Sequence, residues 1–211
     1  MLSYLTTPLD YFGVAVFAVT GALVASRKQM DLVGFVFLGT VTGVGGGTVR
    51  DMALGQLPVF WVRHPPYLLI CVAVSVLVFF TAHIPESRLR LLAWLDALGL
   101  ALFCVLGAET ALAHGPVVAA TMGVVTAVMG GMIRDILGGE SPFILRREIY
   151  ATAALAGAAA FLLASPLLAR DAALAVGFVA AFGLRGLALR FGWSLPPYRA
   201  RPGRMPDQVG L

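Results

Sequence analysis

The chain has 211 residues, of which 59% are hydrophobic and only 12% are charged, whereas about a quarter of the residues of a soluble domain are charged. A core that buried this much apolar surface in water would be larger than so short a chain can enclose, but a bilayer solvates such surface directly. The net charge of +4 is spread over loops and the tail without forming a basic face, which excludes nucleic acid as a partner. The composition predicts an all-α membrane protein.

Seven apolar runs come close to the roughly 20 residues that a helix needs to cross the hydrocarbon layer. In chain order they are 7–26, 31–50, 66–83, 92–112, 116–135, 148–165 and 171–190. The segment before Arg27 contains no Lys or Arg, so we expect a retained span rather than a cleaved signal peptide. Because the connections are short, we predict a single transmembrane domain over residues 1–190, followed by a tail over residues 191–211.

Basic residues in the loops predict the orientation of the chain. If the amino terminus lies outside, the outer loops hold chiefly Arg63 and Arg170, and most other Lys and Arg residues lie inside. The residues on the inner side are Arg27, Lys28, Arg88, Arg90, Arg146, Arg147, Arg190, Arg199, Arg201 and Arg204. We therefore expect a multi-pass protein of the inner (plasma) membrane with its carboxyl terminus in the cytoplasm.

The sequence contains an internal repeat. The stretch from Asp10 to Ala22 recurs as Asp96 to Ala108, with identical residues at seven of thirteen positions. A second block also recurs in the same order, with matches at Gly46/Gly130, Gly47/Gly131, Arg50/Arg134, Asp51/Asp135, Gly55/Gly139, Pro58/Pro142 and Arg63/Arg147. Each copy, about 7–83 and 92–165, holds three spans, so the copies must have opposite orientations, with 171–190 as a seventh helix. Inverted repeats of this kind are typical of proteins that move solutes across membranes.

Glycines interrupt the second and fifth runs at corresponding positions. They are Gly45, Gly46 and Gly47 in the second run, and Gly130 and Gly131 in the fifth. Each costs roughly 1 kcal/mol relative to alanine inside a helix, so we expect both helices to bend or break. Exposed backbone carbonyls near the midplane would then line a water-filled path that favours cations. The alternative is that the glycines, with Gly39 and Gly43, only let neighbouring helices pack closely.

Charged pairs follow both groups of glycines, at Arg50-Asp51 and Arg134-Asp135. A charge inside a span costs about 3 kcal/mol, so these pairs are expected to face each other or the water at the mouths of a path. The alternative is that the arginines reach the lipid headgroups from span ends.

Other polar residues of the spans have two interpretations each. Asp10 and Asp96 stand near the starts of spans, where helix capping is the expected role of Asp10 and a place in a pore vestibule is the second. Glu109 either lines the path or ends its helix at the interface. Hydroxyl groups that would either face an ion or bond to their own helix belong to Thr20, Thr40, Thr42 and Thr126.

Motifs for catalysis or for a cofactor are not found in the sequence. Cys71 and Cys104 lie in apolar runs without metal-ligand spacing, and no phosphate-binding loop or nucleophile motif is present. We therefore predict neither an enzyme nor a bound cofactor.

Several of these motifs occur together in one known family. They are the Asp-x-x-Gly of the first span, Arg27-Lys28-Gln29-Met30-Asp31, Gly45-Gly46-Gly47-Thr48-x-Arg50-Asp51, Pro58-Val59-Phe60-Trp61, Gly130-Gly131-x-x-Arg134-Asp135 and Leu145-Arg146-Arg147-Glu148-Ile149-Tyr150. Over residues 8–197 the chain resembles the prokaryotic branch of the trimeric intracellular cation (TRIC) channel family, also described as glycine-transporter-like. The chain departs from the family pattern at Met129, where the family often has another glycine.

The resemblance implies a homotrimer in which each protomer has its own pore for potassium and sodium. It implies kinks in the second and fifth helices, and hydrophilic funnels that hold the two Arg-Asp pairs. The kink residues would be Gly45, Gly46, Gly47, Gly130 and Gly131, the funnel residues Arg50, Asp51, Arg134 and Asp135, and further pore-lining candidates Thr42, Thr126 and Glu109.

Three functions remain open from the sequence. The first is a passive channel for monovalent cations, with membrane lipid as its surroundings. The second is a secondary transporter for a small zwitterion such as glycine, whose carboxylate would bind at helix amino ends. The third is a structural or lipid-binding bundle that does not conduct.

Overall fold

The computed structural model of the protein describes residues 6–83, 87–146 and 148–196. Arg147, Arg199, Arg201 and Arg204, which the sequence analysis placed on the inner side, lie outside the described residues. Within them the chain forms eight α-helices and two short 3-10 turns. The α-helices are α1 (Thr6–Arg27), α2 (Leu32–Ala53), α3 (Phe60–Arg63), α4 (Pro66–Thr81), α5 (Arg88–Thr110), α6 (Pro116–Leu137), α7 (Ala151–Ala164) and α8 (Arg170–Phe191); the turns are η1 (Leu112–His114) and η2 (Phe143–Leu145).

Each predicted apolar run corresponds to one of the longer helices. By length and composition, α1, α2, α5, α6 and α8 are suited to cross a membrane, whereas α4 and α7 are apolar but have only 16 and 14 residues. The four-residue helix α3 was not predicted and lies in the connection between α2 and α4. The protein is therefore an all-helical membrane protein.

Local sequence signals explain where several helices begin and end. Asp31 precedes α2, and its side chain accepts a hydrogen bond from the amide of Gly34 at 2.8 Å. Ser87 caps α5 in the same way, so this helix begins at Arg88, earlier than the predicted run at 92. Pro116 starts α6, where a missing amide hydrogen costs nothing, and Gly192 ends α8 in the left-handed conformation.

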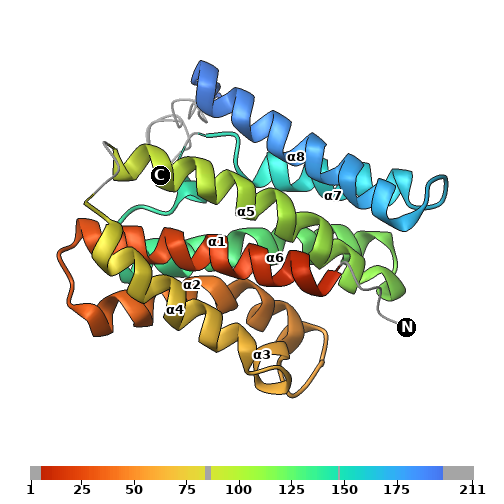
Figure 1. The fold of residues 1–211 in the computed structure, drawn as a ribbon. Helices are drawn as coiled ribbons and strands as arrows, with labels where there is room; N and C mark the ends of the chain where they lie inside the picture. The colour runs from red at the N-terminus through yellow and green to blue at the C-terminus, as the bar shows by residue number, and fades with distance from the viewer. Residues whose placement is uncertain (1–5, 84–86, 147, 197–211) are drawn as a thin grey trace, which may run out of the picture.

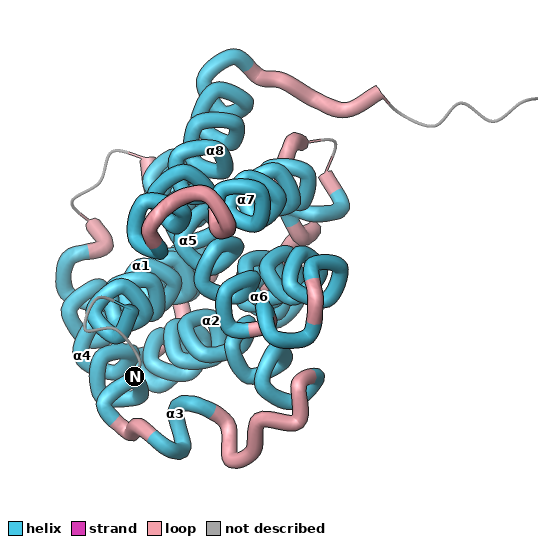
Figure 2. Tube along the Cα trace, turned by 90° about the vertical axis from the view of Figure 1, so that its right-hand side faces the viewer, coloured by secondary structure: helices cyan, strands magenta, loops and turns pink. Residues whose placement is uncertain are grey.

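The helices form one bundle around α5. In Figure 1, α7 and α8 lie on one side of α5, and α1, α2 and α4 lie on the other, with α8 outermost. Helix α5 packs against α1, α6, α7 and α8, whereas α2 packs against α1, α4 and α6. Viewed from the end, as in Figure 2, α1, α2, α5 and α6 surround the middle of the bundle.

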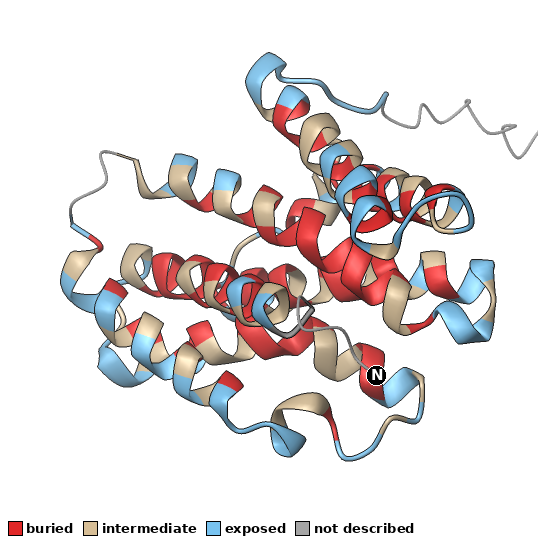
Figure 3. Ribbon diagram, turned by 45° about the vertical axis from the view of Figure 1, so that its right-hand side comes forward, coloured by how far each residue is buried: buried red, intermediate tan, exposed pale blue. Residues whose placement is uncertain are grey.

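The burial pattern agrees with a lipid environment. Buried residues gather in the centre of the bundle and exposed ones at its periphery (Figure 3). Large apolar side chains nevertheless remain exposed on the outward faces of the helices, including Val33, Leu69, Phe80, Leu163 and Val179. Such a surface is unusual for a protein in water and is expected where helices face lipid.

Of the predicted bend or break in the glycine-rich helices, the break is wrong, and the bend stays a prediction. Helix α2 is continuous through Gly45, Gly46 and Gly47, and α6 is continuous through Gly130 and Gly131. The sequence argument treated glycine as a helix breaker, but packing overrides this weak preference when a neighbouring helix needs the space. Contacts with neighbouring helices, described below, account for these glycines.

Candidate functional site

Helices α2 and α6 cross at a backbone contact that glycine makes possible. A Cβ atom on Gly46 would overlap the carbonyl oxygen of Thr126, and one on Gly130 would lie 2.6 Å from the carbonyl oxygen of Thr42. Thr42 and Thr126 correspond in the sequence repeat, as do Gly46 and Gly130. The two copies therefore contribute the same pair of residues to the crossing, and this contact matches the close-packing alternative for the glycines.

The same exchange occurs between α1 and α5. A Cβ atom on Gly13 would lie 2.9 Å from the Phe103 ring, and one on Gly99 would overlap the ring of Phe17. Gly13 corresponds to Gly99 in the repeat and Phe17 to Phe103, and the two rings lie 5.2 Å apart. Equivalent residues of the two copies thus meet in the centre of the bundle.

Thr42 and Thr126 direct their hydroxyl groups into their own helices. Thr42 donates to the carbonyl of Leu38, and Thr126 donates to that of Met122, both at 2.6 Å. Both residues are buried. In this conformation their hydroxyl hydrogens are used within the helix, as the alternative interpretation of threonine expects.

Each Arg-Asp pair anchors the short helix that follows it. Asp51 accepts hydrogen bonds from Arg50 at 2.8 and 3.0 Å and from the Phe60 amide at 2.7 Å. The Phe60 ring lies 5.9 Å from the guanidinium carbon of Arg50, within the range of a cation–π contact. The Asp51 carboxylate therefore fixes the start of α3, and this places the Phe60 ring over Arg50.

The second copy repeats this arrangement at η2. Asp135 accepts from Arg134 at 2.8 Å and from the Phe143 amide at 3.1 Å, and the Phe143 ring lies 5.5 Å from the Arg134 guanidinium carbon. Phe60 was noted from the sequence only as part of a family motif, and Phe143 was missed. An aromatic residue eight or nine positions after each Asp was the available signal.

The loops after the Arg-Asp pairs keep the spacing of the helices through Gly55/Gly139, which both have positive φ, and are shifted by one position after Pro58/Pro142. Phe60 matches Phe143, and Arg63 matches Arg146, because both arginines donate to backbone carbonyls of their own loop. The sequence analysis paired Arg63 with Arg147, which lies outside the described residues. A loop that is one residue shorter in the second copy accounts for the shift.

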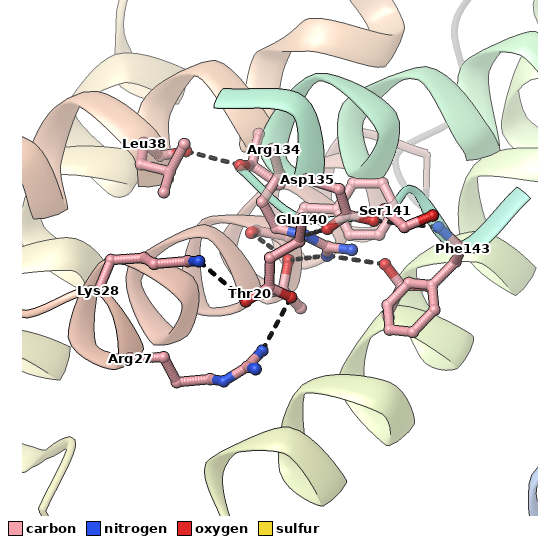
Figure 4. Close-up of polar contacts among 12 residues, drawn as sticks. Thr20, Arg27, Lys28, Leu38, Arg134, Asp135, Glu140, Ser141 and Phe143 are labelled. Carbon is pink, nitrogen blue, oxygen red and sulfur yellow. Dashed lines mark hydrogen bonds and ion pairs between the residues drawn. The ribbon is translucent and has the colours of Figure 1, made fainter. Parts of the chain in front are cut away.

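Arg134 is the centre of a buried polar network (Figure 4). Its side chain has no exposed surface, and it donates to Asp96 at 2.8 Å, to Thr20 at 2.9 Å and to Asp135 at 2.8 Å. These three oxygens come from α5, α1 and α6. Two carboxylates and a hydroxyl replace the hydrogen bonds to water that the guanidinium loses when it is buried.

Asp96 lies more than two turns inside α5 and is fully buried. The expectation that it stands at the start of its span is wrong because α5 begins earlier, at Arg88. One of its carboxylate oxygens has no hydrogen-bond partner among the described residues, and the same is true of one Arg134 nitrogen and the Tyr150 hydroxyl. A Cβ atom on Gly131 would lie 3.0–3.4 Å from atoms of all three residues, so they border the same small region.

The corresponding residues of the first copy are arranged differently. Arg50 pairs with Asp51, but within the described residues no ion pair joins it to Asp10, the counterpart of Asp96. Asp10 is half-buried and lies beyond the first turn of α1, so the expected capping role is wrong. The second copy therefore has an ion pair between helices, from Arg134 to Asp96, and the described part of the first copy has no equivalent.

Three further charged groups connect segments far apart in the sequence. Glu140 lies 3.0 Å from Arg27, 3.8 Å from Lys28 and 3.9 Å from Arg146, and Figure 4 shows Arg27 and Lys28 reaching toward it. Glu109 accepts a hydrogen bond from Arg170 at 2.7 Å, which joins α5 to the start of α8.

The third of these groups is Arg185 in α8. It is fully buried and bonds to Glu148 at 2.7 Å and to the carbonyl of Ile149 at 3.1 Å. Sequence analysis missed this residue, although an arginine inside the last apolar run was a visible signal.

Fold and site define a multi-pass helical membrane protein with a polar network inside the bundle. The sequence profile of a family described as "Glycine transporter" matches residues 7–83 and 93–166. The UPF0126 inner membrane protein YadS of Escherichia coli K12 is 43% identical over 201 residues, which cover 90% of this chain and 94% of that protein. The chain belongs to this family, and it also resembles solved structures of TRIC channels.

Two of those structures resemble the chain over nearly its whole length. The trimeric intracellular cation channel orthologue from Rhodobacter sphaeroides is 60% identical, with a TM-score of 0.88, and the match covers 90% of this chain and all of that one. A prokaryotic TRIC channel crystallised in 0.5 M KCl is 33% identical, with a TM-score of 0.85, over 90% of this chain and 98% of that one. The resemblance noted from the sequence motifs is confirmed.

Proposed function

We propose that the protein is a channel for monovalent cations, potassium and sodium, with the ion path between α2 and α6. The observation that carries the proposal is the reciprocal crossing of these helices at Gly46/Thr126 and Gly130/Thr42. Relatives at 60% and 35% identity are described as cation channels, which supports the same activity here.

The two copies form inverted repeats under this proposal. Both family-profile matches, 7–83 and 93–166, lie over the two copies expected from the sequence. Reciprocal contacts between the copies at two helix pairs support a two-fold relation: Gly13–Phe103 with Gly99–Phe17 between α1 and α5, and Gly46–Thr126 with Gly130–Thr42 between α2 and α6. We infer that all seven longer helices span the inner (plasma) membrane. The amino terminus then lies outside and the carboxyl terminus in the cytoplasm.

The described conformation is closed where α2 and α6 touch. We infer that the helices hinge at Gly45, Gly46, Gly47, Gly130 and Gly131 when the path opens, because glycine allows backbone angles that other residues resist. Half-buried Met129 would then stand beside the path and narrow it. Thr42, Thr126 and Glu109 are the further candidates for its lining.

The Arg-Asp pairs would stand at the two mouths of the path. Arg50 and Asp51 lie at the end of α2, and Arg134 and Asp135 near the end of α6, which are opposite sides of the membrane if the repeats are inverted. Charged side chains at such places concentrate counter-ions from solution. We further propose a homotrimer with one path in each protomer, on the grounds that the Rhodobacter relative is described as trimeric.

Purified protein in potassium-loaded liposomes tests the proposal. Addition of a proton carrier should give rapid, non-saturating potassium efflux, and liposomes that contain Gly46→Leu protein should lose it. Retention of potassium by liposomes with correctly inserted protein would contradict the proposal.

A second candidate is a secondary transporter for a small zwitterion. The observation that favours it is the description of the matched family as "Glycine transporter". It predicts saturable glycine uptake that is accelerated by glycine inside the liposomes, without unitary currents. The cation channel predicts neither saturation nor acceleration.

A further inference from the structure

The surroundings of the Arg134 guanidinium consist of oxygen atoms from three helices. Thr20 of α1, Asp96 of α5 and Asp135 of α6 each accept from it. The second carboxylate oxygen of Asp96 has no hydrogen-bond partner among the described residues, and neither has the hydroxyl oxygen of Tyr150. The site thus holds two carboxylates against one guanidinium, and more oxygen atoms than the arginine uses.

Carboxylate and hydroxyl oxygens are also what a cation pathway offers a passing ion. Arginine keeps its positive charge under all physiological conditions and is more weakly hydrated than an ammonium group, so it tolerates burial among such oxygens. The Arg134 guanidinium therefore occupies a position among these oxygens that a bound cation could also occupy.

We propose that the oxygens of Thr20, Asp96 and Asp135 form a binding site for a monovalent cation, which the guanidinium of Arg134 occupies in the described conformation as a tethered competitor. This inference rests on the proposed cation path and deepens it. Conduction requires the guanidinium to leave, and the departing charge is replaced by the permeating ion, so the two carboxylates never remain buried without a cation.

The first copy supplies independent support. Arg50 and Asp10 correspond to Arg134 and Asp96, yet no ion pair joins them within the described residues, and the Asp10 side chain accepts no hydrogen bond there. The same residue types therefore occur bridged in one copy and unbridged in the other. Arg50, which pairs with Asp51 alone, shows the arrangement that the proposal assigns to Arg134 when the guanidinium has left Asp96.

Thermal unfolding of the detergent-solubilised Arg134→Ala protein tests the inference without measuring any flux. Unfolding is followed in potassium chloride and in N-methyl-D-glucamine chloride of equal ionic strength. The variant should unfold at a temperature higher by about 3 °C or more in potassium, because a bound ion stabilises only the folded state. The wild type, whose site is filled, should show no difference between the two salts.

Three further variants isolate the site. Arg134→Gln keeps more of the side-chain volume and serves where Arg134→Ala is too unstable to purify. Adding Thr20→Val to either variant should reduce the potassium effect, because it removes one of the three oxygens. Arg185→Ala is the matched control: it also removes a fully buried arginine, but one whose ion-pair partner is the single carboxylate of Glu148, and it should not distinguish the two salts.

Equal unfolding temperatures of the Arg134 variants in both salts would overturn the inference and leave Arg134 as a structural bridge. Failure to obtain either variant folded in high potassium would also count against it, since potassium is proposed to replace the lost charge. If potassium stabilises the variants while the wild type moves no ions in liposomes, the cation site stands and the proposed channel function fails.

Discussion

Gly46 of α2 touches the carbonyl oxygen of Thr126 in α6, and its counterpart Gly130 touches the carbonyl oxygen of Thr42. No side chain separates the two helices at these points. Any Cβ atom must push against the backbone, which cannot rotate away as the end of a flexible side chain can. The crossing therefore has no room for an added methyl group unless the backbone moves.

Gly46→Ala should lower the free energy of unfolding by about 1–3 kcal/mol, the usual cost of overpacking a tight contact. Gly130→Ala should cost a similar amount because it meets the equivalent carbonyl. The matched control is Gly183→Ala in α8, where no atom lies within 4 Å of the added Cβ, so the better helix propensity of alanine should leave stability unchanged or slightly higher. Chemical denaturation in detergent measures all three, and equal effects at Gly46 and Gly183 would contradict the close-contact interpretation.

Asp96→Asn should destabilise the protein by about 3–5 kcal/mol, because it leaves the fully buried Arg134 with one charged partner instead of two. Asp171→Asn is a suitable control, since Asp171 belongs to an exposed ion pair with Arg170, and the change should stay within about 1 kcal/mol. Thermal unfolding followed by circular dichroism compares them. Similar losses for both variants would show that the Arg134 network contributes little.

Glu140→Gln should make the stability of the protein less dependent on salt. In the wild type Glu140 lies within 4 Å of Arg27, Lys28 and Arg146, and these partly exposed pairs are screened as ionic strength rises. The variant should lose at most about 1 kcal/mol at low salt and converge with the wild type at high salt. An equally steep salt dependence in both proteins would mean that the cluster does not link α1 to the loop after α6.

Single cysteines should reveal the orientation of the chain. The natural residues Cys71 and Cys104 are buried, so labelling of the parent protein should be low. Under the proposed topology, Lys28→Cys should react with a membrane-impermeant maleimide only after lysis, whereas His64→Cys should react in intact cells. The reverse pattern would invert the proposed topology.

The sequence predicted the helices better than their interior. Hydropathy alone located all seven longer helices, because each is a continuous apolar run in the sequence, and the identities around Asp10 and Asp96 revealed the repeat. It missed α3 because a four-residue helix has no periodicity, and its start depends on the Asp51 carboxylate that accepts from the Phe60 amide.

The candidate site was predicted only in part. The Arg50-Asp51 and Arg134-Asp135 pairs were found as residues, but their environments were not, because burial depends on which helices pack around them. Glycine propensity misled the prediction of a helix break, since the Thr126 carbonyl that needs the space at Gly46 belongs to the other copy of the repeat, far along the chain. The bridge from Arg134 to Asp96 was invisible for the same reason.

The reversal potential of single channels under a potassium chloride gradient tests the central claim most directly. With purified protein in a planar bilayer, unitary currents should reverse close to the equilibrium potential of potassium. Reversal at the chloride potential, or the absence of unitary currents from protein that has been shown to insert, would contradict a cation path through this bundle.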